Sequence, residues 1–305
     1  MFDEKQGPIE NLVHLYVDGA FSRRELIQRV AAYTGSMAAA IAAVGSFSEV
    51  RADDTPACAI DASVPADAPD LNISDVQFAG EASSVFGHLA YPLGIESQVS
   101  PAVIVIHENR GLVEHIRDVT RRVGRAGFVS LGVDLLSRQG GTAQFTDAAA
   151  QSAAYGRTTV EGRRADLIAG IAYLKTLPFV QADRIGVVGF CAGGGNVWDL
   201  AVNVEELAAA VAFYGTPLPT DADVAKIKAP VLANYAELDR ALTLRTAPVM
   251  TAMITLQKTF GFRIYQGVGH AFHNDTGPNY NAAASCDAWT QTIAWFDKFL
   301  RAPAA

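Results

Sequence analysis

The sequence predicts an α/β protein with a mostly parallel central sheet that is covered by helices on both faces. From residue 71 onward, short apolar runs typical of strands alternate with helical patterns. Some of these runs, such as 102–106, are continuously aliphatic, as expected for strands buried on both faces. A glycine-rich turn then joins one strand directly to a helix near residue 190. Because strands that are separated by helices return in parallel, this alternation indicates a parallel sheet.

The expected elements follow one another along the chain. Strands are expected at residues 76–78, 85–91, 102–106, 128–131, 185–189, 208–214, 230–235 and 263–266. Helices are expected at 116–126, 163–177, from about 194, and at 283–300. The first helix is stopped by Gly127 and the second by Pro178. In a sheet of this kind, chemistry is expected at the carboxyl ends of the strands.

Composition narrows the class of protein and its partners. The chain has 305 residues, of which 50% are hydrophobic and 18% are charged, so it can bury a sizeable core and is not disordered as a whole. Its net charge is −8, with no basic stripe, which argues against nucleic acid or an anionic membrane as a partner. Three cysteines cannot all pair within the chain and are too few for a disulfide scaffold.

Residues 1–50 allow two interpretations. Ser22 and Glu25 can form a capping box, and the following apolar residues have helical spacing, which favours a helical extension. Paired arginines followed by the Ala/Gly-rich run 30–47 also resemble a twin-arginine export signal. Arg29 sits inside what would be the apolar part of such a signal, and no clear cleavage site follows Phe47. We therefore favour the helix, and a cytoplasmic location over a periplasmic one. The run is too short and too polar for a convincing membrane span.

Residues 51–70 are expected to form a linker. They contain five Asp and three Pro, with little apolar periodicity. The α/β domain is therefore expected to begin near Leu71 and to cover residues 71–305. An apolar helical extension could also pair two copies of the chain, so a homodimer is a further expectation.

The sharpest chemical signal is Gly189-Phe190-Cys191-Ala192-Gly193, which lies between an expected strand and an expected helix. It matches the G-x-S-x-G nucleophile elbow with cysteine in place of serine. In that turn the glycines allow close passage of the chain, and the helix N-terminus favours negative charge on the thiol. The alternative is a buried structural cysteine in a glycine-rich turn. A phosphate-binding loop is not favoured, because no G-x-x-x-x-G-K-[ST] pattern is present.

An elbow enzyme places an acid and then a histidine downstream of the nucleophile. Asp239 follows the expected strand 230–235, and His270 follows the expected strand 263–266, so both can reach Cys191. His270 would act as the base toward the thiol, and Asp239 would hold its tautomer and orientation. Glu237 is the alternative acid.

His270 and His273 have the i, i+3 spacing of a metal-ligand pair. No second pair of ligands accompanies them, and Cys191 is better explained as a nucleophile. We therefore expect neither a metal nor an organic cofactor.

With Cys191, Asp239 and His270 in this order, residues from about 75 to 301 resemble the dienelactone hydrolase (carboxymethylenebutenolidase-like) family of α/β-hydrolases. The resemblance implies the α/β-hydrolase fold and a Cys-His-Asp triad. It implies that Glu108 takes part in activating the thiol. It also implies that the backbone N–H groups of Asn109 and Ala192 form the oxyanion hole.

The sequence departs from the family at the substrate site. Family members that open dienelactones hold the substrate carboxylate with arginines, one of them four residues after the histidine, where this chain has Asn274. Arg110 and Arg138 are the candidate substrate-binding replacements, with Arg157 as a further one. A different ester or lactone is therefore as well supported as a dienelactone.

The expected function is hydrolysis of a small carboxylic ester or lactone, with lactones of the dienelactone type favoured, through an acyl-enzyme on Cys191. Two alternatives remain open. One is a broad-specificity carboxylesterase on the same fold, and the other is a non-enzymatic protein that binds ligands or senses oxidants through its thiol.

Overall fold

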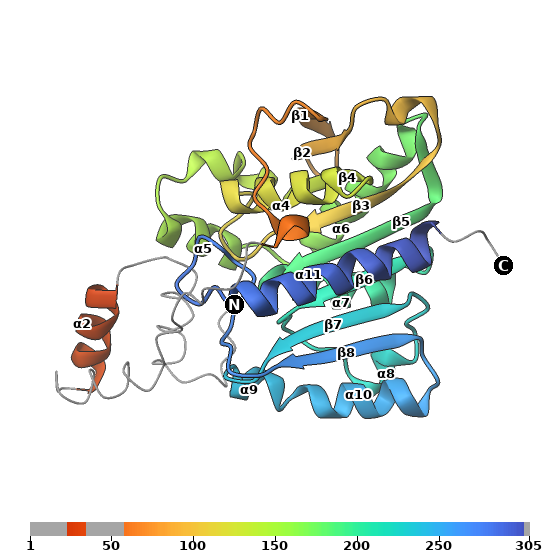
Figure 1. Cartoon of the computed structure of the whole chain (residues 1–305). Coiled ribbons are helices and arrows are strands. Elements are labelled where there is room, and N and C mark those ends of the chain that lie inside the picture. The colour runs from red at the N-terminus through yellow and green to blue at the C-terminus, as the bar shows by residue number, and fades with distance from the viewer. Residues whose placement is uncertain (1–22, 35–57, 302–305) are drawn as a thin grey trace.

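The computed structural model describes residues 23–34 and 58–301, and its core is one eight-stranded sheet (Figure 1). The strand order is β1-β2-β4-β3-β5-β6-β7-β8. The β1–β2 and β2–β4 pairs are antiparallel, and all the other pairs are parallel. The predicted α/β architecture with a mostly parallel sheet is confirmed.

Each expected strand is present. The strands are β1 (Leu71–Ala79), β2 (Ser84–Pro92), β3 (Ser100–Ile106), β4 (Val129–Asp134), β5 (Val180–Phe190), β6 (Ala209–Phe213), β7 (Val231–Ala236) and β8 (Phe260–Tyr265). The expected helices are α4 (Glu114–Arg125), α6 (Val160–Thr176), α7 (Ala192–Asn203) and α11 (Ala282–Phe296). The structure adds α5 (Ala148–Gly156), α8 (Asp221–Val224), α9 (Arg240–Thr243) and α10 (Thr246–Thr255).

Helices cover both faces of the sheet, so its central strands are fully buried. Helices α4 and α11 lie on one face, and α6 and α7 pack side by side on the other (Figure 1). Residues 102–106 of β3 are completely inaccessible, which explains their continuous aliphatic sequence. The predicted inward side of α11 is also correct, since Trp289, Ile293, Phe296 and Leu300 are all buried.

Residues 58–70, which we expected to belong to a linker, are instead packed against the domain. They begin with a 3-10 turn at Ala59–Asp61, and Cys58 forms a disulfide with Cys286 of α11. The side chains of Val64 and Ala68 are buried. The segment lacks apolar periodicity because polar contacts, rather than an apolar face, hold most of it in place. We call residues 58–64 the N-terminal tether.

Residues Arg23–Thr34 form helix α2. The rest of the predicted N-terminal extension, including Ser22 of the expected capping box, lies outside the described residues. Within residues 23–34 and 58–301, no helix is both long and apolar enough to cross a membrane.

Candidate active site

The predicted nucleophile lies in a sharp turn between β5 and α7. Cys191 has φ 53° and ψ −116°, a backbone conformation that non-glycine residues rarely adopt. Both flanking glycines are required by close packing. A Cβ on Gly189 would lie 2.3 Å from the Gly193 carbonyl oxygen, and a Cβ on Gly193 would lie 2.3 Å from the Ile106 carbonyl oxygen. The turn therefore presents the thiol at the carboxyl edge of the sheet.

The structure brings the predicted acid and base together at the same edge. Asp239 follows β7, and His270 lies in the loop after β8. The Asp239 carboxylate accepts a hydrogen bond of 2.5 Å from Nδ1 of His270, and the two side chains are only 8% and 5% exposed. This bond fixes the imidazole so that Nε2 is available to the Cys191 thiol, with which the His270 side chain interacts. The alternative acid, Glu237, is turned away and accepts a hydrogen bond from the Gly267 N–H.

The electrostatics of the site favour the protonated form of His270. Burial lowers the pKa of His270, but the negative charges of Cys191 and Asp239 outweigh this effect and raise that pKa well above its ordinary value. Cys191 forms no disulfide and is buried at the N-terminus of α7, where the helix dipole also favours negative charge. The site can therefore supply a nucleophile without a metal.

The loop after β3 carries Glu108 and is fixed by its neighbour His107. Nε2 of His107 accepts a hydrogen bond from the Leu135 N–H at 3.0 Å, so its Nδ1 carries the proton and donates to the Glu108 carbonyl. The Glu108 side chain is buried, and one of its oxygens accepts a hydrogen bond of 3.1 Å from the Asn274 amide. Asn274 thus binds Glu108, at the position where the resemblance implied an arginine for a substrate carboxylate.

The two expected oxyanion donors lie on adjoining segments. Ala192 is the first residue of α7, where backbone N–H groups have no partner within the helix. Asn109 follows Glu108 in the loop after β3. The close approach of Gly193 to the Ile106 and His107 carbonyls places the start of α7 against that loop.

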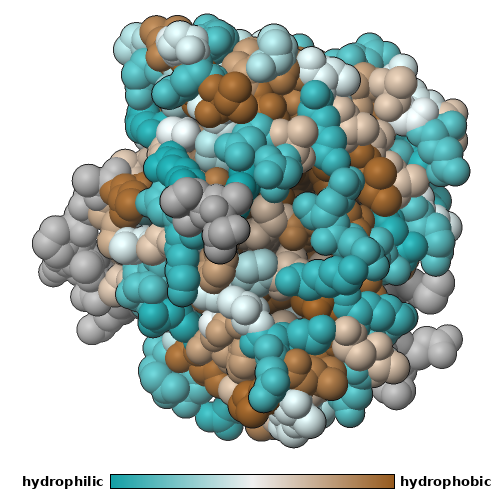
Figure 2. Space-filling view, turned by 90° about the vertical axis from the view of Figure 1, so that its right-hand side faces the viewer, coloured by the Kyte–Doolittle hydropathy of each residue, from teal (hydrophilic) through white to brown (hydrophobic). Residues whose placement is uncertain are grey.

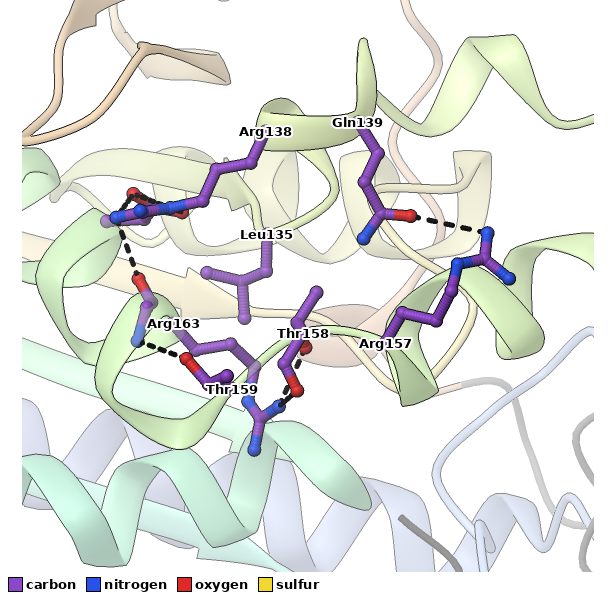
Figure 3. A pocket seen from close by; sticks show the side chains of 9 residues that line it. Leu135, Arg138, Gln139, Arg157, Thr158, Thr159 and Arg163 are labelled. Carbon is purple, nitrogen blue, oxygen red and sulfur yellow. Dashed lines mark hydrogen bonds and ion pairs between the residues drawn. The ribbon is translucent and has the colours of Figure 1, made fainter.

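Two of the candidate substrate-binding arginines, Arg138 and Arg157, line the same cavity. Arg138 lines a cavity of about 330 Å³ and makes hydrogen bonds of 2.9–3.1 Å to Asp166, which balances its charge. Figure 3 shows Arg157 on the opposite side of this cavity, turned toward Gln139. Arg110 is half-buried in the loop after β3.

Two tyrosines beside the site were missed by the sequence reasoning. The Tyr214 ring lies 4.9 Å from the His270 ring, and its φ of 38° places it in a second strained turn, after β6. Tyr155 accepts a hydrogen bond from Asn196 and packs on His107. Burial raises the pKa of Tyr155, and the negative charge of nearby Cys191 adds to this. Tyr214 ends an expected strand and could have been noticed, whereas Tyr155 lies in α5, which carries no amphipathic signal.

His273 is not paired with His270 for metal binding. Its Nε2 lies 3.2 Å from Asp61 of the N-terminal tether, on the other side of the loop. In the part of the chain that the structure describes, no three His, Cys, Asp or Glu side chains are grouped to hold a metal ion.

A mostly parallel sheet with a nucleophile turn after one strand, an acid after a later strand and a histidine after the last strand defines an α/β-hydrolase. The dienelactone hydrolase family matches residues 89–300. The chain belongs to this family, and it is a hydrolase that acts on ester or lactone bonds.

Known relatives agree with this assignment. A protein of Methylorubrum extorquens named "Putative carboxymethylenebutenolidase" is 32% identical over 211 residues, covering 65% of this chain and 72% of its own. A Synechocystis protein with the same name is 30% identical over 248 residues, covering 76% and 99%. Among solved structures, a dienelactone hydrolase-like promiscuous phosphotriesterase from metagenomic libraries has a TM-score of 0.66 and 26% identity, covering 75% of this chain and 99% of its own.

Proposed function

We propose that Cys191, His270 and Asp239 hydrolyse a small ester or lactone through an acyl-enzyme intermediate. The observation that carries this proposal is the alignment of Asp239 with Nδ1 of His270, beside a cysteine held at φ 53° in the elbow. An ordinary thiol with a pKa of ~8.5 is only a few per cent ionised at neutral pH. In the proposed thiolate–imidazolium pair, the ionised fraction of the Cys191 thiol is much larger than this.

The proposed reaction has two halves. The Cys191 thiolate attacks the carbonyl carbon, and the N–H groups of Asn109 and Ala192 stabilise the oxyanion, each typically worth ~3–4 kcal/mol. Collapse of this intermediate breaks the ester C–O bond, and the leaving alkoxide takes the proton from Nε2 of His270. His270 then takes a proton from water, which attacks the thioester and releases the acid and the thiolate. In a lactone, the new alcohol stays attached to the acyl group.

We further propose that the substrate is a lactone whose recognition does not depend on a charged side chain at position 274. Asn274 is neutral, is 4% exposed and is already bonded to Glu108. The Arg138 guanidinium is balanced by Asp166. A carboxylate substituent on the lactone ring would therefore gain little binding energy from either residue.

The test is a panel of matched substrates. Each lactone ring is assayed with and without a carboxylate substituent, beside linear p-nitrophenyl esters, using the wild type and Cys191→Ala. We expect Cys191→Ala to lose activity, and mass spectrometry of the wild type to show a transient acyl adduct on Cys191. Equal activity in both proteins would refute the nucleophile. A broad carboxylesterase would turn over linear esters as fast as lactones.

Two further expectations can be proposed with their tests. The disulfide between Cys58 and Cys286 favours the periplasm over the cytoplasm, because disulfides persist in oxidising compartments. Cell fractionation of the full chain beside an Arg23→Lys/Arg24→Lys variant would check this, with only the variant expected to stay inside. A homodimer would be recognised by its sedimentation.

A further inference from the structure

The N-terminal tether is held in the domain by a buried polar network centred on Asp61. The Asp61 side chain is 2% exposed. Its carboxylate accepts hydrogen bonds from Arg122 at 2.9 Å and from Ser285 at 2.6 Å, and it lies 3.2 Å from Nε2 of His273. Burial acts to raise the pKa of Asp61, but these partners, with His273 first, lower it to about 2. Asp61 is therefore a buried anion that is fully paired.

The same network reaches the loop that carries the proposed catalytic histidine. Arg122 of α4 binds Asp61 and also donates to Asp275, and Asp275 lies 3.2 Å from Nδ1 of His115. His273 and Asp275 belong to the same loop as His270, which follows β8. Two of the six residues in 270–275 thus contact the network around the tether.

Two other polar side chains in 270–275 contact the proposed catalytic residues. His270 binds Asp239 and interacts with Cys191, while Asn274 binds Glu108. Between these groups, the fully buried His273 ring lies 5.0 Å from the ring of Phe190, the residue that precedes the nucleophile. His273 lies only three residues after His270 in this loop, so we expect a shift of His273 to displace His270 as well.

We infer that Asp61 is a positioning residue for the reaction, which it serves by holding His273 and hence His270 in register with Cys191. This inference rests on the proposed function of the triad. On this inference, residues 58–64 help to position the proposed catalytic residues without contacting the substrate.

The disulfide fixes Asp61 in this role. Cys58 lies three residues before Asp61, and Cys286 directly follows Ser285, which donates to the Asp61 carboxylate. The covalent bond therefore holds the tether at the point where Asp61 meets α11. Loss of the bond frees the chain on the N-terminal side of Asp61.

The test compares Asp61→Asn with Asp70→Asn. Asp70 lies beyond the tether and pairs with Arg125 of the same helix α4, but this pair is exposed. We expect Asp61→Asn to lower kcat by about 10- to 100-fold with little change in KM, since a misplacement of about 1 Å costs this much. We also expect the half-maximal pH for Cys191 alkylation by iodoacetamide to rise, because a displaced His270 stabilises the thiolate less. Asp70→Asn should keep wild-type values.

A folded Asp61→Asn protein with wild-type kcat and an unchanged alkylation profile would overturn the inference, even if its melting temperature fell. If Asp61→Asn does not fold, the double variant Cys58→Ser/Cys286→Ser replaces it, because it removes the disulfide without leaving a second reactive thiol; the same two measurements and the same expected directions apply. Alkylation reports on Cys191 without any ester substrate. A wild type that hydrolyses nothing, yet differs from Asp61→Asn in alkylation, refutes the proposed function and supports the positioning role.

Discussion

The hydrogen bond between Asp239 and His270 should set the alkaline limit of activity. In the proposed mechanism an imidazolium must protonate the leaving alkoxide, so activity should fall as pH rises through the pKa of His270. That pKa is raised in part by Asp239, whose carboxylate lies 2.5 Å from Nδ1. Replacing Asp239 with Asn keeps the shape of the side chain and removes its charge. The alkaline limb should therefore move to lower pH.

The size of the effect follows from the geometry. With about 4 Å between the charge centres and an effective dielectric constant of about 20, a pair of unit charges is worth about 4 kcal/mol. One pH unit corresponds to about 1.36 kcal/mol, so the ceiling is about three units. Opposite charges at such distances shift pKa values by about one to three units in practice. Loss of tautomer control should also reduce kcat, by up to about 10⁴-fold as in serine triads.

The assay is the pH profile of kcat/KM for the best lactone, measured for wild type, Asp239→Asn and Glu237→Gln. Glu237 is the matched control, since it lies in the same loop but binds the Gly267 N–H instead of His270. We expect only Asp239→Asn to move the alkaline limb. An Asp239→Asn profile that superimposes on the wild type would refute the assigned acid, and a shift in Glu237→Gln alone would exchange the two roles.

Three further substitutions test the packing around the site. Gly193→Ala would place a Cβ 2.3 Å from a β3 carbonyl oxygen and should destabilise the protein by about 1–3 kcal/mol in urea unfolding. Gly156→Ala is the control, because its Cβ would have no neighbouring atom within 4 Å, and it should be neutral or stabilising. Asn274→Asp would place a second carboxylate about 3 Å from Glu108 and should lower the free energy of unfolding by about 2–3 kcal/mol at pH 7. This loss of stability should shrink in acid, where one of the two carboxyl groups takes up a proton. An equal loss at pH 5 would contradict the contact between the two side chains. Cys286→Ser removes a disulfide that joins residues 228 positions apart, and it should lower the free energy of unfolding by about 2–5 kcal/mol. An unchanged midpoint of thermal unfolding would argue against the disulfide.

The sheet and the turn that carries Cys191 were predictable because their signals are local. Buried strands such as 102–106 are aliphatic without interruption, and the elbow needs two glycines at fixed spacing around Cys191. Asp239 and His270 could be identified because each follows a recognisable strand. Figure 2 shows the side of the molecule away from the carboxyl ends of the strands, where hydrophobic residues are scattered between polar ones.

The remaining features depend on contacts between distant residues. Helix α5 is rich in alanine and has no apolar face, and α10 carries a proline in its first turn, so neither produces a clear helical pattern. Asp61 lies in a proline-rich stretch that reads as a linker. Its partners Arg122, His273 and Ser285 are identified only when the fold brings them together. A single polar residue in a loop has no periodicity that could reveal such a role.

The contacts around Asp61 also bear on the order of folding. Asp61 meets Ser285 across 224 residues of sequence, and Glu108 meets Asn274 across 166. Contacts of this range close the longest loops in the domain and are expected to form after the more local strand pairs. His270, the proposed catalytic histidine, would then reach its final position only when the two ends of the domain have met. On refolding, ester hydrolysis should therefore return later than the far-ultraviolet signal of the sheet, and a newly made chain would stay inactive until α11 has docked.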